Sequence, residues 1–147
     1  MAKWKKQSHV IYQCTYHIVW CPKYRFRILT GEVEKFVEKS IRSLCEWKRA
    51  EILELNIRED HIHIVLDLPP RESVAELMGL LKGKTAIKLF KSYQGLRKKP
   101  YWGNHFWARG YCVSTVGIDE EQIRKYVKYQ EEKEREEERE QQQSGLF

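Results

Sequence analysis

Residues 59–67 read EDHIHIVLD, and this stretch decides how the chain folds. Ile62 and Ile64 alternate with polar residues, which is the period of a β-strand that buries one face. Burying the isoleucines places His61 and His63 together on the opposite face. The stretch therefore predicts a strand that presents two neighbouring imidazoles away from the core.

The segments around this strand alternate between strand-like and helix-like patterns. In chain order we expect a strand at 9–20, a helix at 31–49, strands at 50–58 and 61–67, a helix from a capping box at 73–76 to about residue 93, a strand at 106–116 and a helix from about residue 119. The order β-α-β-β-α-β-α is that of an α+β protein with a ferredoxin-like, RRM-like split βαβ antiparallel sheet. The last helix is an addition to that fold.

Charge is distributed unevenly along the 147 residues. The formal net charge is +6, but residues 131–140 hold seven acidic and three basic side chains, so the rest of the chain carries +10. A basic excess of this size on a small domain favours polyanions, with nucleic acid first and an anionic membrane second. We expect one catalytic domain at 1–130 and a charged, frayed or disordered tail at 131–147.

Two features bear on the compartment. No apolar run approaches the roughly 20 residues needed to span a bilayer, and the N-terminal charges are not followed by an apolar signal region. The four cysteines are scattered without a CxxC pair, which disfavours a structural zinc site and favours buried thiols. We expect a cytoplasmic protein without a membrane partner.

A second group of candidate site residues lies in the last predicted helix. Tyr126 and Gln130 are four residues apart and therefore share a helix face. Two imidazoles and a carboxamide oxygen are suitable ligands for a divalent metal, and a phenol beside them is a suitable nucleophile. We therefore predict His61, His63 and Gln130 as metal ligands and Tyr126 as the nucleophile in phosphodiester chemistry.

These assignments have competing interpretations. The His-x-His motif alone is equally compatible with a hydrogen-bonded surface pair, but the strand register and nearby acceptors at Asp60 and Asp67 favour metal binding. Tyr129 is a rival nucleophile, and we prefer Tyr126 because no metal-binding residue follows Tyr129 by one helical turn. We interpret His17 as structural, because a lone histidine is more often a hydrogen-bonded core or edge residue.

Five blocks of the sequence, in order from about residue 9 to 130, resemble a known family. They are 16–25 (YHIVWCPKYR), 60–63 (DHIH), 80–84 (LLKGK), 106–111 (FWARGY) and 126–130 (YVKYQ). In these blocks the chain is similar to the IS200/IS605-family transposases, which are single-tyrosine enzymes of the HUH superfamily. The resemblance implies that Tyr126 attacks a scissile phosphate with Mg²⁺ or Mn²⁺ and without ATP, leaving a 5′-phosphotyrosine and a free 3′-hydroxyl. It also implies single-stranded, hairpin-bearing DNA and a homodimer whose tyrosine helix completes the partner's histidine site.

Basic and aromatic residues interleave in several places, as in proteins that bind single-stranded nucleic acid. We expect DNA contacts from Lys23, Arg25, Arg27, Lys84, Lys88, Lys91 and Trp107, with a further basic and aromatic cluster at 97–102. For each residue alone, a solvated charged face is the competing explanation. Gly117, just before the last helix, is either a turn residue or a hinge for the Tyr126 helix.

The leading hypothesis is a transposase that cuts and rejoins single-stranded DNA at hairpin-containing element ends. One alternative is a related enzyme that acts on chromosomal hairpin repeats, or a replication or conjugation nickase. Another is a non-catalytic RNA-binding module, but the sequence lacks an RNP1 pattern and this hypothesis does not explain His61, His63 and Gln130.

Overall fold

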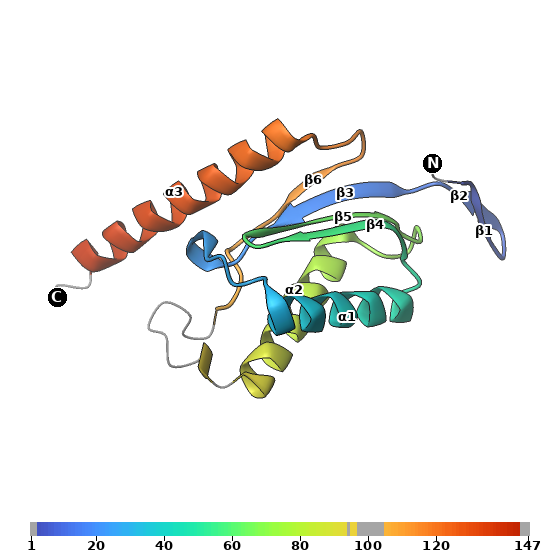
Figure 1. Cartoon of the computed structure of the whole chain (residues 1–147). Helices are drawn as coiled ribbons and strands as arrows, with labels where there is room; N and C mark the ends of the chain where they lie inside the picture. Colours follow the sequence, from blue (N-terminus) through green and yellow to red (C-terminus); the bar gives the residue numbers. More distant parts are fainter. Residues whose placement is uncertain (1–2, 94, 97–104, 145–147) are drawn as a thin grey trace.

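The computed structural model describes residues 3–93, 95–96 and 105–144. Within these residues the chain forms a four-stranded antiparallel sheet, a separate two-stranded hairpin and three α-helices (Figure 1). The elements are β1 (Lys5–Gln7), β2 (Val10–Tyr12), β3 (Thr15–Trp20), the 3₁₀ turn η1 (Lys23–Arg25), α1 (Gly31–Trp47), β4 (Glu51–Arg58), β5 (His61–Asp67), α2 (Val74–Ser92), β6 (Cys112–Ser114) and α3 (Glu120–Ser144).

The strand order of the main sheet is β4-β5-β3-β6. The two central strands, β5 and β3, pair antiparallel with Trp20 opposite Ile62 and Val19 opposite His63. β4 and β6 form the edges, so the strand that follows α1 and the strand that follows α2 lie on opposite sides of the central pair. This is the ferredoxin-like topology that the element order predicts.

Both long strands of the prediction are shorter in the structure. The expected strand at 9–20 is divided, because Val10–Tyr12 pairs with β1 in the separate hairpin and only Thr15–Trp20 joins the main sheet. The expected strand at 106–116 is reduced to β6, with a single bridge between Pro22 and Trp107 before it. Residues 106–108 are all buried in succession, and Gly110 has φ +89°, so the start of the second segment does not keep the alternation of a strand.

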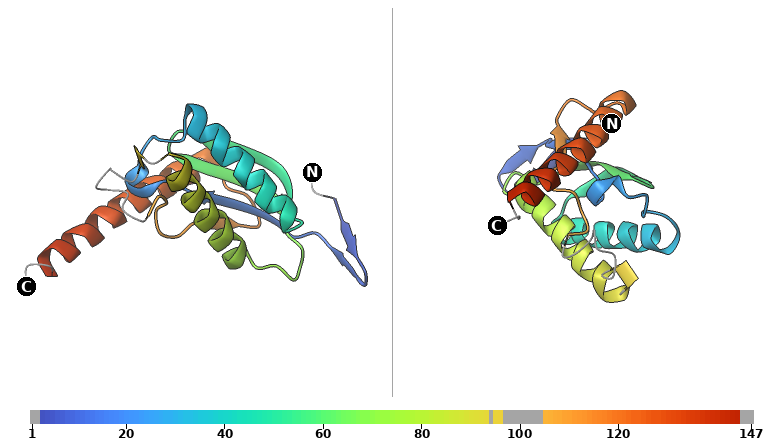
Figure 2. Two further views of the ribbon diagram at one scale, coloured as in Figure 1. Left: turned by 90° about the horizontal axis from the view of Figure 1, so that it is seen from below. Right: turned by 90° about the vertical axis from the view of Figure 1, so that its left-hand side faces the viewer.

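The main core lies between the sheet and helices α1 and α2, which cover the same face (Figure 2). Ile18, Trp20, Ile62 and Ile64 are fully buried there. The predicted capping box opens α2, since the Ser73 side chain accepts a hydrogen bond of 3.0 Å from the backbone N–H of residue 76. The amphipathic patterns of the sequence therefore identified this face correctly.

The third helix, α3, lies on the other face and projects beyond the sheet (Figure 1). The expected frayed or disordered tail is helical through Ser144. An i,i+4 ion pair joins Arg135 and Glu131 at 3.1 Å, and the Glu134 side chain is only 6% exposed. Packing and local ion pairs thus extend the helix past residue 130. No described helix is long and apolar enough to cross a membrane.

Candidate active site

Two histidines of β5 point to the side of the sheet opposite the main core. Their positions follow from the alternation, because Ile62 and Ile64 occupy the core side. The Nε2 atom of His63 is buried and has no hydrogen-bond partner among the described residues. Burial, followed by the neighbouring His17, lowers the pKa of His63. A neutral imidazole with an unoccupied ring nitrogen is the form that ligates a metal.

His17 of β3 lies beside His63, with 5.9 Å between the ring centroids. Both rings line a hollow that we call the histidine hollow, whose walls include His17, Asn56, His61, His63, Gly117 and Ile118. Interpreting His17 as merely structural therefore missed a residue of this site. Strand alternation in the sequence places the His17 side chain on the face of β3 away from the core residue Ile18. The pairing of β3 with β5, which brings His17 beside His63, is not visible in the sequence.

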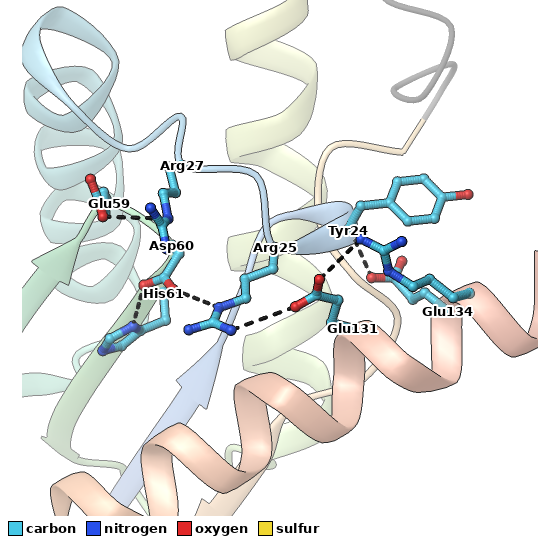
Figure 3. Close-up of polar contacts among 9 residues, drawn as sticks. Tyr24, Arg25, Arg27, Glu59, Asp60, His61, Glu131 and Glu134 are labelled. Carbon is cyan, nitrogen blue, oxygen red and sulfur yellow. Dashed lines mark hydrogen bonds and ion pairs between the residues drawn. The ribbon is translucent and has the colours of Figure 1, made fainter.

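His61 is held by a carboxylate that is itself held by an arginine. Asp60 Oδ1 lies 2.8 Å from His61 Nδ1, and Asp60 Oδ2 accepts a hydrogen bond of 2.9 Å from Arg25 Nε (Figure 3). Burial alone would raise the pKa of Asp60, but the bonds with Arg25 and His61 outweigh burial and lower it. Asp67, the other predicted acceptor, instead accepts a hydrogen bond of 2.5 Å from Thr15 at the far end of the strand.

Tyr126 and Gln130 share the inner face of α3 but do not line the histidine hollow. The Tyr126 hydroxyl is buried beside the small cluster of Val19 and Val127, without a hydrogen-bond partner among the described residues. Burial raises the pKa of this phenol. Gln130 is 6% exposed and donates a 2.7 Å hydrogen bond to the Arg109 carbonyl. Within one chain, Tyr126 thus packs on Val19, which pairs with His63 across the sheet, whereas the Gln130 amide is already bonded to a backbone carbonyl.

The rival tyrosine, Tyr129, faces away from the sheet and is 54% exposed. Its hydroxyl accepts a hydrogen bond of 3.3 Å from the Lys133 ammonium, so it belongs to the outer surface of α3. In the described part of the chain, no three His, Cys, Asp or Glu side chains gather closely enough to hold a metal. A metal at His61 and His63 therefore requires a ligand of another type or from another chain.

Comparison with known proteins identifies the family. A family model described as IS200-like transposase matches residues 10–130. The chain belongs to this transposase family. The transposase of insertion sequence IS200 from Salmonella typhimurium is 42% identical over 134 residues, covering 91% of this chain and 88% of the relative. The ISDra2 transposase TnpA from Deinococcus radiodurans is 34% identical over 131 residues, covering 88% of this chain and 93% of the relative.

Solved structures agree with the fold. A crystal structure of a transposase-like protein from Deinococcus radiodurans matches with a TM-score of 0.76 at 29% identity and covers 86% of this chain and 97% of its own. A REP-associated tyrosine transposase bound to a REP hairpin matches with a TM-score of 0.52 at 16% identity, covering 85% of this chain and 68% of its own. The second likeness supports the fold alone.

The residues predicted to contact DNA are not equivalent in this transposase. Lys84, Lys88 and Lys91 are exposed on α2, as a binding surface requires. Trp107 is 6% exposed and donates a 2.9 Å hydrogen bond to the Thr85 hydroxyl, so the prediction that it stacks on bases is wrong and it is a core residue.

The basic turn that follows β3 is largely engaged with acidic side chains. Lys23 Nζ lies 4.0 Å from Glu134, and Arg25 contacts two carboxylates. Arg27 is the most exposed of the three, at 67%, with Glu59 at 3.5 Å. The predicted cluster at 97–102 lies outside the described residues.

All four cysteines are free, and Cys21 and Cys45 are buried. Burial raises the pKa of the Cys21 and Cys45 thiols to about 12. These two thiols are therefore protonated at neutral pH and are poor nucleophiles and metal ligands, as expected of structural cysteines.

Proposed function

We propose that this transposase cuts and rejoins single-stranded DNA at hairpin-containing ends of its element, with Tyr126 as the nucleophile. The observation that carries the proposal is the pair His61 and His63 on the sheet face opposite the main core, with a buried and unpartnered Nε2 on His63 among the described residues. The relatives are transposases of insertion sequences, which supports DNA as the substrate class.

The residues present fit a divalent metal. The unpartnered Nε2 of His63 and the Asp60-held ring of His61 are two suitable ligands, and the amide oxygen of Gln130 is a suitable third. Mg²⁺ or Mn²⁺ bound there would supply Lewis-acid polarisation of a phosphate oxygen. The charge on the scissile phosphate would then oppose nucleophilic attack less strongly.

Tyr126 performs the covalent step. Its oxygen forms a bond to phosphorus, the bond from phosphorus to the 3′ oxygen breaks, and the phenol proton ends on the released 3′-hydroxyl. The DNA remains linked through a 5′-phosphotyrosine ester that retains the energy of the broken bond. A 3′-hydroxyl can reverse the step at a new junction, so no ATP is needed.

We further propose that Tyr126 and Gln130 complete the histidine hollow of a partner subunit. Neither residue is among those that line the hollow of its own chain, and the Tyr126 hydroxyl is buried without a hydrogen-bond partner among the described residues. Gly117, at φ +118°, joins β6 to α3 and provides a backbone conformation at which the helix could reorient. A homodimer with two shared sites is consistent with both observations.

The first experiment tests the nucleophile. The protein is incubated with Mg²⁺ and a labelled, hairpin-bearing single-stranded oligonucleotide, and covalent adducts are resolved on a denaturing gel. We expect an adduct with single-stranded but not duplex DNA, lost in Tyr126→Phe and His63→Ala and retained in Tyr129→Phe. An adduct that survives Tyr126→Phe but not Tyr129→Phe would reverse the assignment.

The second experiment tests the shared site. His63→Ala and Tyr126→Phe proteins are assayed separately and after subunit mixing. Each variant alone should be inactive, whereas the mixed dimer keeps one site with intact histidines from one subunit and an intact tyrosine from the other. Failure of the mixture, after subunit exchange has been verified, would mean that each chain supplies its own tyrosine.

A further inference from the structure

We propose that Arg25 is a positioning residue for the metal ligand His61, and not a contact to DNA phosphates. This inference rests on the proposed metal site. It reverses the expectation that the three basic residues of the turn after β3 act alike. The inference rests on a chain of polar contacts from Arg25 in η1 through the Asp60 carboxylate to the His61 imidazole (Figure 3).

The Asp60 carboxylate uses its two oxygens on two different partners. Oδ2 accepts from Arg25 Nε at 2.9 Å, and Oδ1 lies 2.8 Å from His61 Nδ1. Asp60 is 9% exposed, so bulk water does not readily replace either partner. When Asp60 accepts from Nδ1–H, the ring tautomer is set and Nε2 is left as the ligating atom.

The guanidinium of Arg25 is already neutralised on two sides. Besides Asp60, its Nη1 lies 3.5 Å from Glu131 Oε2 of α3, and the side chain is 32% exposed. A phosphate at this position would have to displace a carboxylate or share the cation with it. The arrangement favours a role inside the protein, between the histidine strand and the tyrosine helix.

The backbone conformation of η1 orients the Arg25 side chain. Tyr24 and Arg25 both have φ +56°, in the left-handed region that residues with a Cβ rarely adopt. The N–H of Tyr24 donates a 2.8 Å hydrogen bond to Glu134 Oε1, which ties the turn to α3. A strained conformation that is held in this way is typical of a functional position.

Arg27 provides a matched control two residues along the same segment. It is 67% exposed and has one exposed partner, Glu59, at 3.5 Å. Among the residues that the structure describes, no hydrogen bond or ion pair joins Arg27 to Asp60 or His61. Arg27 therefore carries the charge of the segment without the connection to the proposed metal site. A phosphate contact would be expected from Arg27 before Arg25.

The test separates metal affinity from DNA affinity. Mn²⁺ is titrated by calorimetry into the wild type, Arg25→Ala, Arg25→Lys, Asp60→Asn, Glu131→Gln and Arg27→Ala, and hairpin DNA binding is measured by fluorescence anisotropy in EDTA. We expect Arg25→Ala and Asp60→Asn to weaken Mn²⁺ binding about 10- to 100-fold, the usual cost of removing a partner of a metal ligand. Arg25→Lys should be intermediate, while Arg27→Ala and Glu131→Gln should match the wild type.

A metal-free measurement keeps the inference independent of the proposed function. Long-range ¹H–¹⁵N spectra at a pH where imidazole is neutral should show His61 as the Nδ1–H tautomer in the wild type and in Arg27→Ala, and as a mixture in Arg25→Lys. This spectrum requires only a folded chain, which the histidine signals themselves report.

The outcomes are distinct. A wild-type tautomer in Arg25→Lys and an unchanged Mn²⁺ affinity in Arg25→Ala, together with weaker DNA binding, would overturn the inference and make Arg25 a phosphate contact. A wild type that binds no Mn²⁺ would overturn the metal site of the proposed function, and the role of Arg25 toward a metal with it. The tautomer result would still decide whether Arg25 orients His61.

Discussion

The two faces of the four-stranded sheet are built for different purposes. The face under α1 and α2 is an extensive apolar core in which Ile18, Ile62 and Ile64 are fully buried. The face under α3 has a small apolar cluster centred on Val19 and Val127, and beside it the histidine hollow, which His17, His61 and His63 line. Strand alternation therefore separates the residues that stabilise the fold from those available for chemistry.

The difference shows how α3 is attached. Beyond the small cluster, its contacts to the body are polar, including Gln130 to the Arg109 carbonyl, Glu134 to the N–H of Tyr24, and Glu131 to Arg25. Polar contacts can be exchanged for water or for a partner at modest net cost, whereas burial of apolar surface cannot. We therefore predict that α3 detaches from its own sheet at a lower free-energy cost than unfolding of the main core requires.

The largest expected effect on stability comes from replacing a buried isoleucine by alanine, a substitution that can be made on each face of the sheet. Ile64→Ala removes a fully buried side chain from the main core and should lower the free energy of unfolding by about 2–5 kcal/mol. Ile123→Ala removes the same atoms from the α3 cluster, where the side chain is 7% exposed, and should cost less than about 2 kcal/mol because α3 can relax. Urea unfolding measures both values, and equal losses would contradict the proposed difference between the faces.

A second comparison concerns the connection to α3. Gly117→Ala should destabilise the protein by about 1–3 kcal/mol, because φ +118° is strained for alanine, although no atom of the described residues beyond its two chain neighbours lies within 4 Å of the added Cβ. Gly79→Ala is the control, since it lies within α2 with equally open space and should stabilise by about 0.5–1 kcal/mol. Thermal and urea unfolding give the two signs. The role of Gly117 is disproved if both substitutions stabilise.

A third prediction concerns the pH dependence of the free energy with which α3 docks on the sheet. Burial raises the pKa of Glu134 more than the Tyr24 N–H and Lys23 lower it, and Lys82 and Glu137 also face it. The folded state therefore binds this proton more tightly than the unfolded state, so docking of α3 should strengthen as pH falls toward the raised pKa. One proton limits the slope to about 1.4 kcal/mol per pH unit.

Hydrogen exchange of the α3 amides, corrected for intrinsic rates, measures this slope. Glu134→Gln should remove it, whereas Glu132→Gln, at an exposed position of the same helix, should retain it. An identical slope in both variants would assign the effect to another group.

The smallest expected effect is at the nucleophile. The Tyr126 hydroxyl is buried without a partner among the described residues, so Tyr126→Phe removes a desolvated polar group. The free energy of unfolding should stay unchanged or rise by up to about 1 kcal/mol, even though covalent activity is lost. A loss of more than that would reveal a structural role for the hydroxyl and weaken the case that it is kept for chemistry.

Local patterns predicted much of the fold and part of the site. Alternation over 59–67 identified the strand and the shared face of its histidines, and the serine at 73 identified the start of α2. The patterns overestimated the strands at 9–20 and 106–116, because strand length depends on which partner is available. They underestimated the last helix, because the burial of Glu134 is a long-range contact.

The sequence by itself determined which side chains share a face. Side chains repeat about every two residues in a strand and about every 3.6 residues in a helix, and both repeats are set locally by the backbone. It also determined the element order from which the ferredoxin-like topology follows. Only the tertiary structure decided that His17 lies beside His63, that Trp107 is buried, and that Arg25 holds Asp60. It also placed the Tyr126 hydroxyl, buried, beside the small cluster around Val19. These facts depend on contacts between residues far apart in the chain, which no local period encodes.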